Sequence, residues 1–177
     1  MTIKTVSIAE ISNITNMIIN NSQGWEYNDS DNLPDDEQTN WNDRHKQACQ
    51  MLSYIGFCMK QYACKKNVAF FVAYFQGVPV GALQFNPRDG YEVPEVDYLA
   101  THCGIRNCGV LLMEYAVNES LQLRKGGKLE LYPLDNAVPA YLKMGFTTLK
   151  DNGCLYLDPV ESPQWYLTNG RYRYRAC

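Results

Sequence analysis

A polar, glycine-containing turn that opens a helix gives this chain a candidate phosphate-binding site. The turn runs from His102 to Gly109, and an apolar pattern with helical spacing begins at Val110. The N–H groups in the first turn of a helix have no intrahelical partner, and the helix dipole adds partial positive charge there. Such a turn can hold a pyrophosphate without a metal ion or a lysine. The candidate residues are Arg106, Asn107, Cys108, Gly109 and Val110, and the alternative is that the turn is only a glycine-assisted connection from a strand to a helix.

Candidate acids and bases lie on either side of this turn. Glu92, Glu95 and Asp97 belong to an extended run that ends at Thr101, and Tyr141 lies in a short helical segment further along the chain. Carboxylates can take up a proton and a phenol can donate one, so both residue types can take part in general acid–base chemistry. The alternative is structural: solvent-facing acids on a half-exposed strand, and a tyrosine that only packs.

The cysteines and histidines offer a rival nucleophile. Cys108 lies near a helix N-terminus, which lowers the pKa of a thiol, and His102 adjoins Cys103. No third residue is evident that would orient the pair, and no Cys/His spacing resembles a zinc site, so we expect no metal. The seven cysteines are interpreted as reduced thiols in a cytoplasmic protein.

Helices and strands alternate along the chain in a way that predicts an α/β (or α+β) fold with a largely antiparallel sheet flanked by helices. Strands are predicted at Val6–Ile11, Val68–Phe75, Val78–Phe85, Glu92–Thr101, Lys128–Tyr132, Phe146–Leu149 and Cys154–Leu157, with a terminal edge strand at Arg171–Arg175. Helices are predicted over Asn13–Asn20, from Asp43 to about Lys66, from Val110 to Leu123, and over Asn136–Met144. Trp25–Asp43 is predicted to be a long acidic loop.

Length and charge narrow the function classes. The 177 residues predict one domain over 1–177, and the net charge of −3 argues against a general nucleic-acid binder. No apolar run approaches the roughly 18 residues that a membrane span needs.

From Val68 to Leu157 the order of motifs resembles the GNAT superfamily of acyl-CoA-dependent N-acyltransferases. The resemblance consists of a strand hairpin, a strand that ends near Leu99, the turn Arg106-x-x-Gly109-x into a helix, another strand, and a helix that ends as Tyr141-x-Lys-x-Gly-Phe. It implies a GNAT-like fold and acetyl-CoA as the co-substrate.

The resemblance also implies roles for individual residues. Backbone groups of Leu99 and Thr101 would face the pantetheine arm, Tyr141 would protonate the leaving sulfur, and Glu95 would be the base, with Asp97 and Glu92 as alternatives. The chain departs from the family pattern twice. Leu111 replaces the small residue that ends the pyrophosphate loop and could block it, and Leu134 replaces an Asn seven residues before Tyr141.

The expected activity is transfer of an acetyl group to a primary amine by direct attack in a ternary complex. Acidic residues beside Trp25, Tyr27 and Trp41 favour a small cationic amine as the acceptor, and a protein amine is the other candidate. Two alternatives remain: a non-catalytic GNAT-like module that binds CoA, and toxin-like acetylation of aminoacyl-tRNA. A homodimer is possible, and no membrane partner is expected.

Overall fold

A computed structural model gives the fold of the chain. It describes residues 1–21, 36–61, 67–149 and 153–175, and of residues 36–38 and 58–61 it describes the backbone alone. The description below is confined to these residues.

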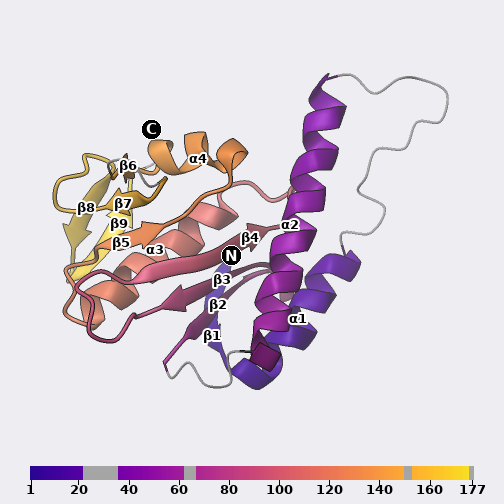
Figure 1. Cartoon of the computed structure of the whole chain (residues 1–177), viewed down its shortest axis with the longest axis horizontal. Coiled ribbons are helices and arrows are strands. Elements are labelled where there is room, and N and C mark those ends of the chain that lie inside the picture. The colour runs from indigo at the N-terminus through magenta and orange to yellow at the C-terminus, as the bar shows by residue number, and fades with distance from the viewer. Residues whose placement is uncertain (22–35, 62–66, 150–152, 176–177) are drawn as a thin grey trace.

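Nine strands and four α-helices make up the described structure. The strands are β1 (Thr2–Val6), β2 (Ala69–Phe75), β3 (Val78–Asn86), β4 (Glu95–Thr101), β5 (Leu129–Leu131), β6 (Thr147–Thr148), β7 (Leu155–Leu157), β8 (Trp165–Thr168) and β9 (Arg171–Tyr174). The helices are α1 (Ile8–Asn21), α2 (Asp36–Gln61), α3 (Cys108–Gln122) and α4 (Val138–Lys143), with a 3-10 turn, η1 (Asp135–Ala137), before α4. Seven strands form one sheet in the order β1-β2-β3-β4-β5-β7-β6, and β8 and β9 form a separate pair (Figure 1).

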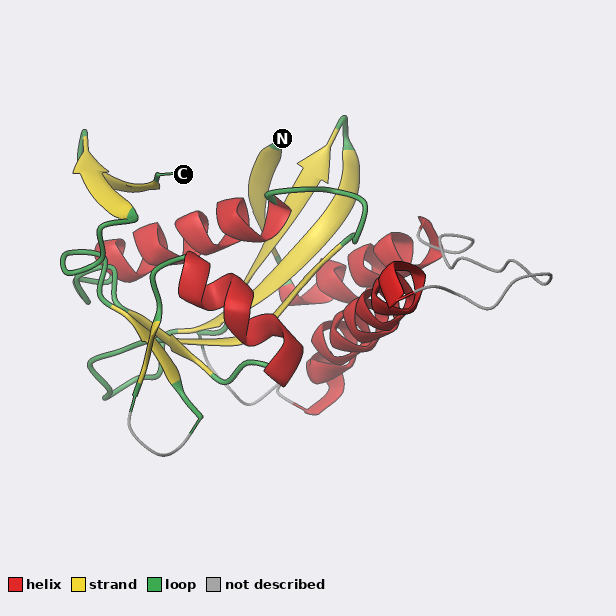
Figure 2. Cartoon of the chain, turned by 90° about the horizontal axis from the view of Figure 1, so that it is seen from above, coloured by secondary structure: helices red, strands yellow, loops and turns green. Residues whose placement is uncertain are grey.

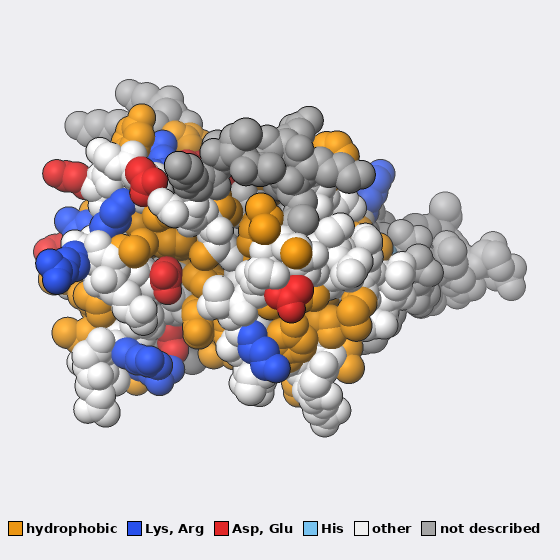
Figure 3. Space-filling view, turned by 90° about the horizontal axis from the view of Figure 1, so that it is seen from below, with side chains coloured by type: hydrophobic (Ala, Val, Ile, Leu, Met, Phe, Trp, Pro, Cys, Tyr) orange, Lys and Arg blue, Asp and Glu red, His pale blue; other side chains and the backbone are white. Residues whose placement is uncertain are grey.

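The large sheet is covered on both faces. Helices α1 and α2 lie side by side on one face, and α3 crosses the other (Figures 1 and 2). Phe71 and Leu83 point toward α3 and pack with Leu112, whereas Phe70 and Val72 point toward Ile11 and Leu52. This alternation along β2 is the period of two that a strand buried on both faces shows. Seen from below, hydrophobic side chains reach the surface between separated charged ones (Figure 3).

Strand β4 is the point at which the sheet divides. It pairs antiparallel with β3, and a register shift opposite Gln84 and Phe85 leaves Asp97 as an extra residue, which makes a β-bulge. With β5 it forms a parallel pair at a single position, Glu95 opposite Glu130. The two strands therefore separate beyond Glu95, toward the end of β4 that leads into α3.

The C-terminal hairpin packs on α3, whose side chains form hydrogen bonds with the backbone of β9 in place of a neighbouring strand. Asn118 donates from Nδ2 to the carbonyl of Tyr172 (2.9 Å) and accepts the N–H of Tyr172 at Oδ1 (2.9 Å). Glu114 accepts the N–H of Tyr174 (3.1 Å) and pairs with Arg173 (2.6 Å). These bonds satisfy the edge of β9 that β8 leaves open.

The predicted fold class is confirmed, and the prediction for the N-terminus is wrong. Val6–Ile11 was predicted as a strand, but β1 ends at Val6 and α1 begins at Ile8. The cause is the capping box Ser7-x-x-Glu10, in which the Glu10 carboxylate accepts the backbone N–H (3.0 Å) and the hydroxyl (2.6 Å) of Ser7. These bonds also lower the pKa of Glu10.

Other boundaries needed smaller corrections. The predicted acidic loop is wrong over residues 36–43, because α2 already begins at Asp36, and the rest of that loop lies outside the described residues. The helix predicted to run to about Lys66 is described as far as Gln61, and residues 62–66 lie outside the described residues. Strand β4 begins at Glu95 rather than at the predicted Glu92, since Pro94 precedes it, and β8 was not predicted.

Candidate active site

The first turn of α3 has the geometry of an anion-binding helix N-terminus. Asn107 precedes the helix in the left-handed conformation (φ 62°), and among the described residues no side chain caps the helix start. The N–H of Leu111 donates to the carbonyl of Asn107 (3.2 Å), which is the first bond of the helix. The N–H groups of Cys108, Gly109 and Val110 therefore precede the intrahelical ladder.

Gly109 turns its bare α-carbon toward the end of β4. A methyl group there would lie 3.8 Å from the Leu99 side chain, 3.9 Å from Thr101 and 4.0 Å from Met144. The space around Gly109 is therefore bounded by the tip of β4 and by the segment after α4. A glycine at this position leaves room for a ligand to approach the backbone, so the residues present fit an acyl-CoA diphosphate.

A cavity of about 320 Å³ opens at the same end of β4. Three parts of the chain line it: β4 and the turn after it, the middle of α2, and the η1–α4 segment. Leu99 and Thr101, which were predicted to face the pantetheine arm, both line this cavity. Across it, Asn136 of η1 donates a hydrogen bond to Gln47 of α2. The cavity therefore joins the divided part of the sheet to helix α2.

Tyr141 lies in α4, mostly buried against the core that α3 and the sheet share. Its ring packs edge-on to Phe146, with the ring centroids 5.6 Å apart. Burial raises the pKa of Tyr141 to about 12. The phenol is consequently protonated over the whole range in which a protein of this kind is studied, which is the state a hydrogen-bond donor needs.

The carboxylates of β4 have different surroundings. Glu95 pairs with Nε of Arg88 (3.3 Å), and the same guanidinium pairs with Glu130 of β5. Asp97, the bulged residue, accepts hydrogen bonds from Nε2 of Gln84 (2.7 Å) and Nδ2 of Asn86 (3.3 Å). Along the strand, Glu95 lies about 13 Å from Leu99 and Asp97 about 7 Å. Glu92 is exposed in the loop before β4.

The rival cysteine nucleophile is not supported. Cys108 is fully buried, its Sγ 4.0 Å from the carbonyl oxygen of Val80, and burial raises its pKa to about 12. Burial also raises the pKa of Cys103. His102 is buried, its Nδ1 accepts the N–H of Gly104 (3.1 Å), and burial lowers its pKa. Burial therefore raises the pKa of the Cys108 thiol, although the N-terminus of a helix would lower it.

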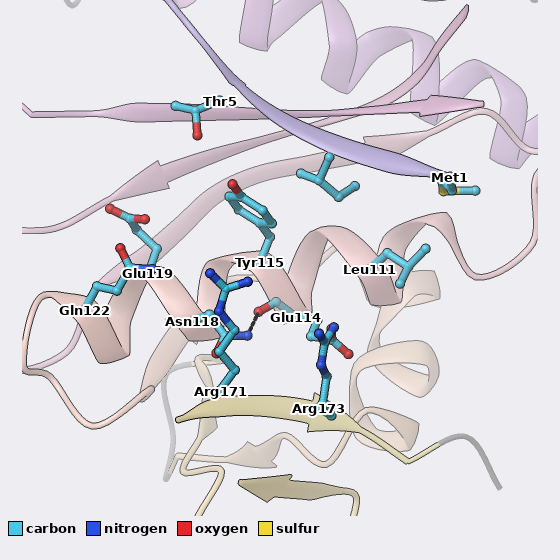
Figure 4. A pocket seen from close by; sticks show the side chains of 11 residues that line it. Met1, Thr5, Leu111, Glu114, Tyr115, Asn118, Glu119, Gln122, Arg171 and Arg173 are labelled. Carbon is cyan, nitrogen blue, oxygen red and sulfur yellow. Dashed lines mark hydrogen bonds and ion pairs between the residues drawn. The ribbon is translucent and has the colours of Figure 1, made fainter. Parts of the chain in front are cut away.

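Leu111 and Arg106 of the predicted loop do not line the cavity at the end of β4. Leu111 lines a separate cavity with Met1 and Tyr115 on the other side of α3 (Figure 4), so its side chain does not line the cavity beside Leu99. Arg106 is exposed. Sequence reasoning missed the contribution of α2, whose Arg44, Gln47 and Met51 line the cavity at the end of β4.

Comparison with known proteins decides the family. The profile of the acetyltransferase (GNAT) family matches residues 26–146, which is more than half of the chain. The chain belongs to the GNAT acetyltransferase family. A search of curated proteins found no match.

Solved structures with the same fold include other GNAT proteins. PaiA N-acetyltransferase from Thermoplasma acidophilum, in complex with coenzyme A, is 15% identical with a TM-score of 0.52, over 89% of this chain and 99% of that one. GCN5 from Tetrahymena is 15% identical with a TM-score of 0.56, over 88% and 94%. A putative acetyltransferase from an Exiguobacterium species is 16% identical with a TM-score of 0.55, over 90% and 95%. At these identities the likeness is one of fold.

Two further observations bear on this GNAT protein. No described helix is both long and apolar enough to cross a membrane. Within the described parts of the chain, no group of three or more His, Cys, Asp or Glu side chains could hold a metal ion.

Proposed function

We propose that this GNAT protein, acting as one domain over residues 1–177, transfers an acyl group, acetyl in the first instance, from acyl-CoA to a primary amine. The amine would attack directly in a ternary complex. The observation that supports this most strongly is the single paired position between β4 and β5, Glu95 opposite Glu130. The gap that follows lies next to Gly109, where the backbone is accessible to a ligand.

The chain's own groups would bind and orient the co-substrate. The N–H groups of Cys108, Gly109 and Val110 would hold the diphosphate, helped by the dipole of α3. The open backbone edge of β4 at Leu99 and Thr101 would pair with the amide-containing arm, as one strand pairs with another. Acyl-CoA supplies the activated acyl group and a thiolate leaving group.

Proton transfer is assigned to two side chains. Tyr141 would donate a hydrogen bond to the sulfur as negative charge develops, because its raised pKa keeps the phenol protonated. Glu95 would accept the proton from the amine through ordered water, since about 13 Å of strand separates it from Leu99. Asp97 is the nearer alternative. The acceptor would be a small cationic amine or a protein amine.

The direct test is release of the CoA thiol from acetyl-CoA against a panel of amines, peptides and aminoacyl-tRNA. Tyr141→Phe is expected to lower kcat about 100-fold, within the usual range for a lost acid catalyst, and to leave CoA affinity within about twofold. Tyr115→Phe is the matched control, because this tyrosine lies on the other side of α3 and packs on Phe71.

Three outcomes would contradict parts of the proposal. If CoA neither binds nor is released with any acceptor, the transferase proposal fails. If CoA binds without turnover, the protein is a CoA-binding module. If Tyr141→Phe turns over as fast as the parent protein, the assignment of the acid is wrong.

A further inference from the structure

A second cavity, of about 410 Å³, lies on the side of α3 that faces β1 and β9 (Figure 4). Its lining comes from β1, from one face of α3 and from β9. It shares no described lining residue with the cavity at the end of β4. Its volume lies within the range of sites that hold small molecules.

Some of its charged groups are already used in holding the hairpin. Arg173 pairs with Glu114 at 2.6 Å, and the same carboxylate accepts the N–H of Tyr174. The carboxamide of Asn118 is occupied by the backbone of Tyr172. These three side chains, together with the backbone of Tyr172 and Tyr174, hold the hairpin on α3 and have little capacity left for a ligand.

Two charged side chains of the lining, one positive and one negative, are not used in holding the hairpin. The guanidinium of Arg171 and the carboxylate of Glu119 make no hydrogen bond or ion pair within the described part of the chain. Arg171 shares the outer face of β9 with Arg173, because alternate residues of a strand point the same way. In Figure 4 the Arg171 side chain rises from β9 across α3, and Glu119 lies about one helical turn beyond Tyr115.

The rest of the lining is of two kinds. Ile3, Leu111 and Tyr115 offer apolar surface, and Thr5 and Gln122 offer neutral hydrogen-bonding groups. The charged side chains of the lining are two arginines and two glutamates, whose charges balance one another. A ligand with only a negative group would face the unpaired Glu119, and a ligand with only a positive group would face the unpaired Arg171. Either would be disfavoured by like-charge repulsion.

We propose that this cavity binds a small zwitterion, a free α-amino acid with an apolar side chain. Arg171 binds the carboxylate in the forked geometry that guanidinium and carboxylate share, and Glu119 binds the ammonium group. The apolar side chain lies against Tyr115, Ile3 and Leu111. The site is separate from the acyl-CoA cleft and does not depend on the proposed transferase activity.

Calorimetric titration of the full-length protein with a panel of free L-amino acids tests the proposal, with L-leucine as the reference probe. L-leucine is expected to bind, whereas 3-methylbutylamine and 4-methylpentanoate, which each keep one of its two charges, bind at least tenfold more weakly. Arg171→Gln and Glu119→Gln each raise the Kd for L-leucine at least tenfold. Arg175→Gln is the matched control, since Arg175 stacks on Tyr166 and does not line the cavity.

A thermal melt of each variant accompanies the titrations, so that a loss of binding is not confused with a loss of fold. The proposal is overturned if no amino acid in the panel binds at about 10 mM, a concentration that detects even millimolar affinity. It is also overturned if the two half-charged analogues bind as well as L-leucine, or if folded Arg171→Gln and Glu119→Gln proteins bind it unchanged. Displacement of L-leucine by CoA would place the ligand in the acyl-CoA cleft and reject the proposal as well.

Discussion

Gly109→Ala separates binding of the acyl-CoA diphosphate from folding. The added methyl group would lie no nearer than 3.8 Å to any neighbouring side chain, which is ordinary van der Waals contact. The backbone of Gly109 does not have a positive φ, so alanine fits it. Alanine in a helix is more stable than glycine by about 0.5–1 kcal/mol. We therefore expect the free energy of unfolding to stay the same or to rise by up to about 1 kcal/mol.

Ligand binding should respond in the opposite direction. The methyl group would project between the tip of β4 and the segment after α4. In the proposed site the diphosphate would approach the backbone N–H groups there to about 2.9 Å. Loss of that approach should weaken CoA binding at least tenfold, which corresponds to about 1.4 kcal/mol.

Thermal melts and calorimetric CoA titrations of the same samples measure both quantities. Ser53→Ala, at an exposed position of α2 where the hydroxyl donates to the carbonyl of Cys49 in the same helix (2.9 Å), serves as a control for a helix substitution remote from the site. A Gly109→Ala protein that is as stable as the parent and binds CoA equally well would refute the assignment of the α3 amides as the diphosphate site.

The remaining predictions concern stability and are read from thermal or chemical unfolding. Asn118→Leu removes both bonds to the backbone of β9 and should cost about 2 kcal/mol, or about 4–8 °C in Tm, whereas Asn118→Asp keeps the acceptor and should cost less. Arg88→Met leaves the carboxylates of Glu95 and Glu130 close together without their cation, where β4 meets β5, and should lower the free energy of unfolding by about 2–4 kcal/mol. An unchanged free energy of unfolding would show that these ion pairs do not stabilise the fold. Because the bonds from Ser7 lower the pKa of Glu10 in the folded protein, their stabilisation is present above the pKa of the unfolded chain, near 4.5, and is lost as the pH falls through the lower folded value. In Glu10→Gln the free energy of unfolding should therefore fall less steeply as the pH is lowered, and an unchanged pH dependence would contradict the role of Glu10 in the cap.

Local patterns were sufficient for much of the fold. The strand pair around Gln76 and Gly77 and the helix that begins at Cys108 follow from period-two and helical spacing, and both lie within two residues of their predicted bounds. The start of α1 was also readable, because Ser7-x-x-Glu10 is a capping signature in the sequence.

Other features depend on contacts between distant segments. The hydrogen bond from Asn136 to Gln47 joins residues 89 positions apart, and no local spacing could reveal that α2 lines the cavity. The reactivity expected of Cys108 failed for a similar reason. Its place at a helix start was visible in the sequence, but its burial against β3 was not, and burial decides the direction of its pKa.

The single bridge between β4 and β5 has a mechanical consequence. Strands β1 to β4 form one ladder and β5, β7 and β6 form another, and they meet at Glu95 and Glu130 under the Arg88 clamp. The gap beyond this bridge already separates the two ladders, although they share one hydrophobic core under α3. A long, flexible ligand could therefore lie between them without breaking a strand pair in either ladder.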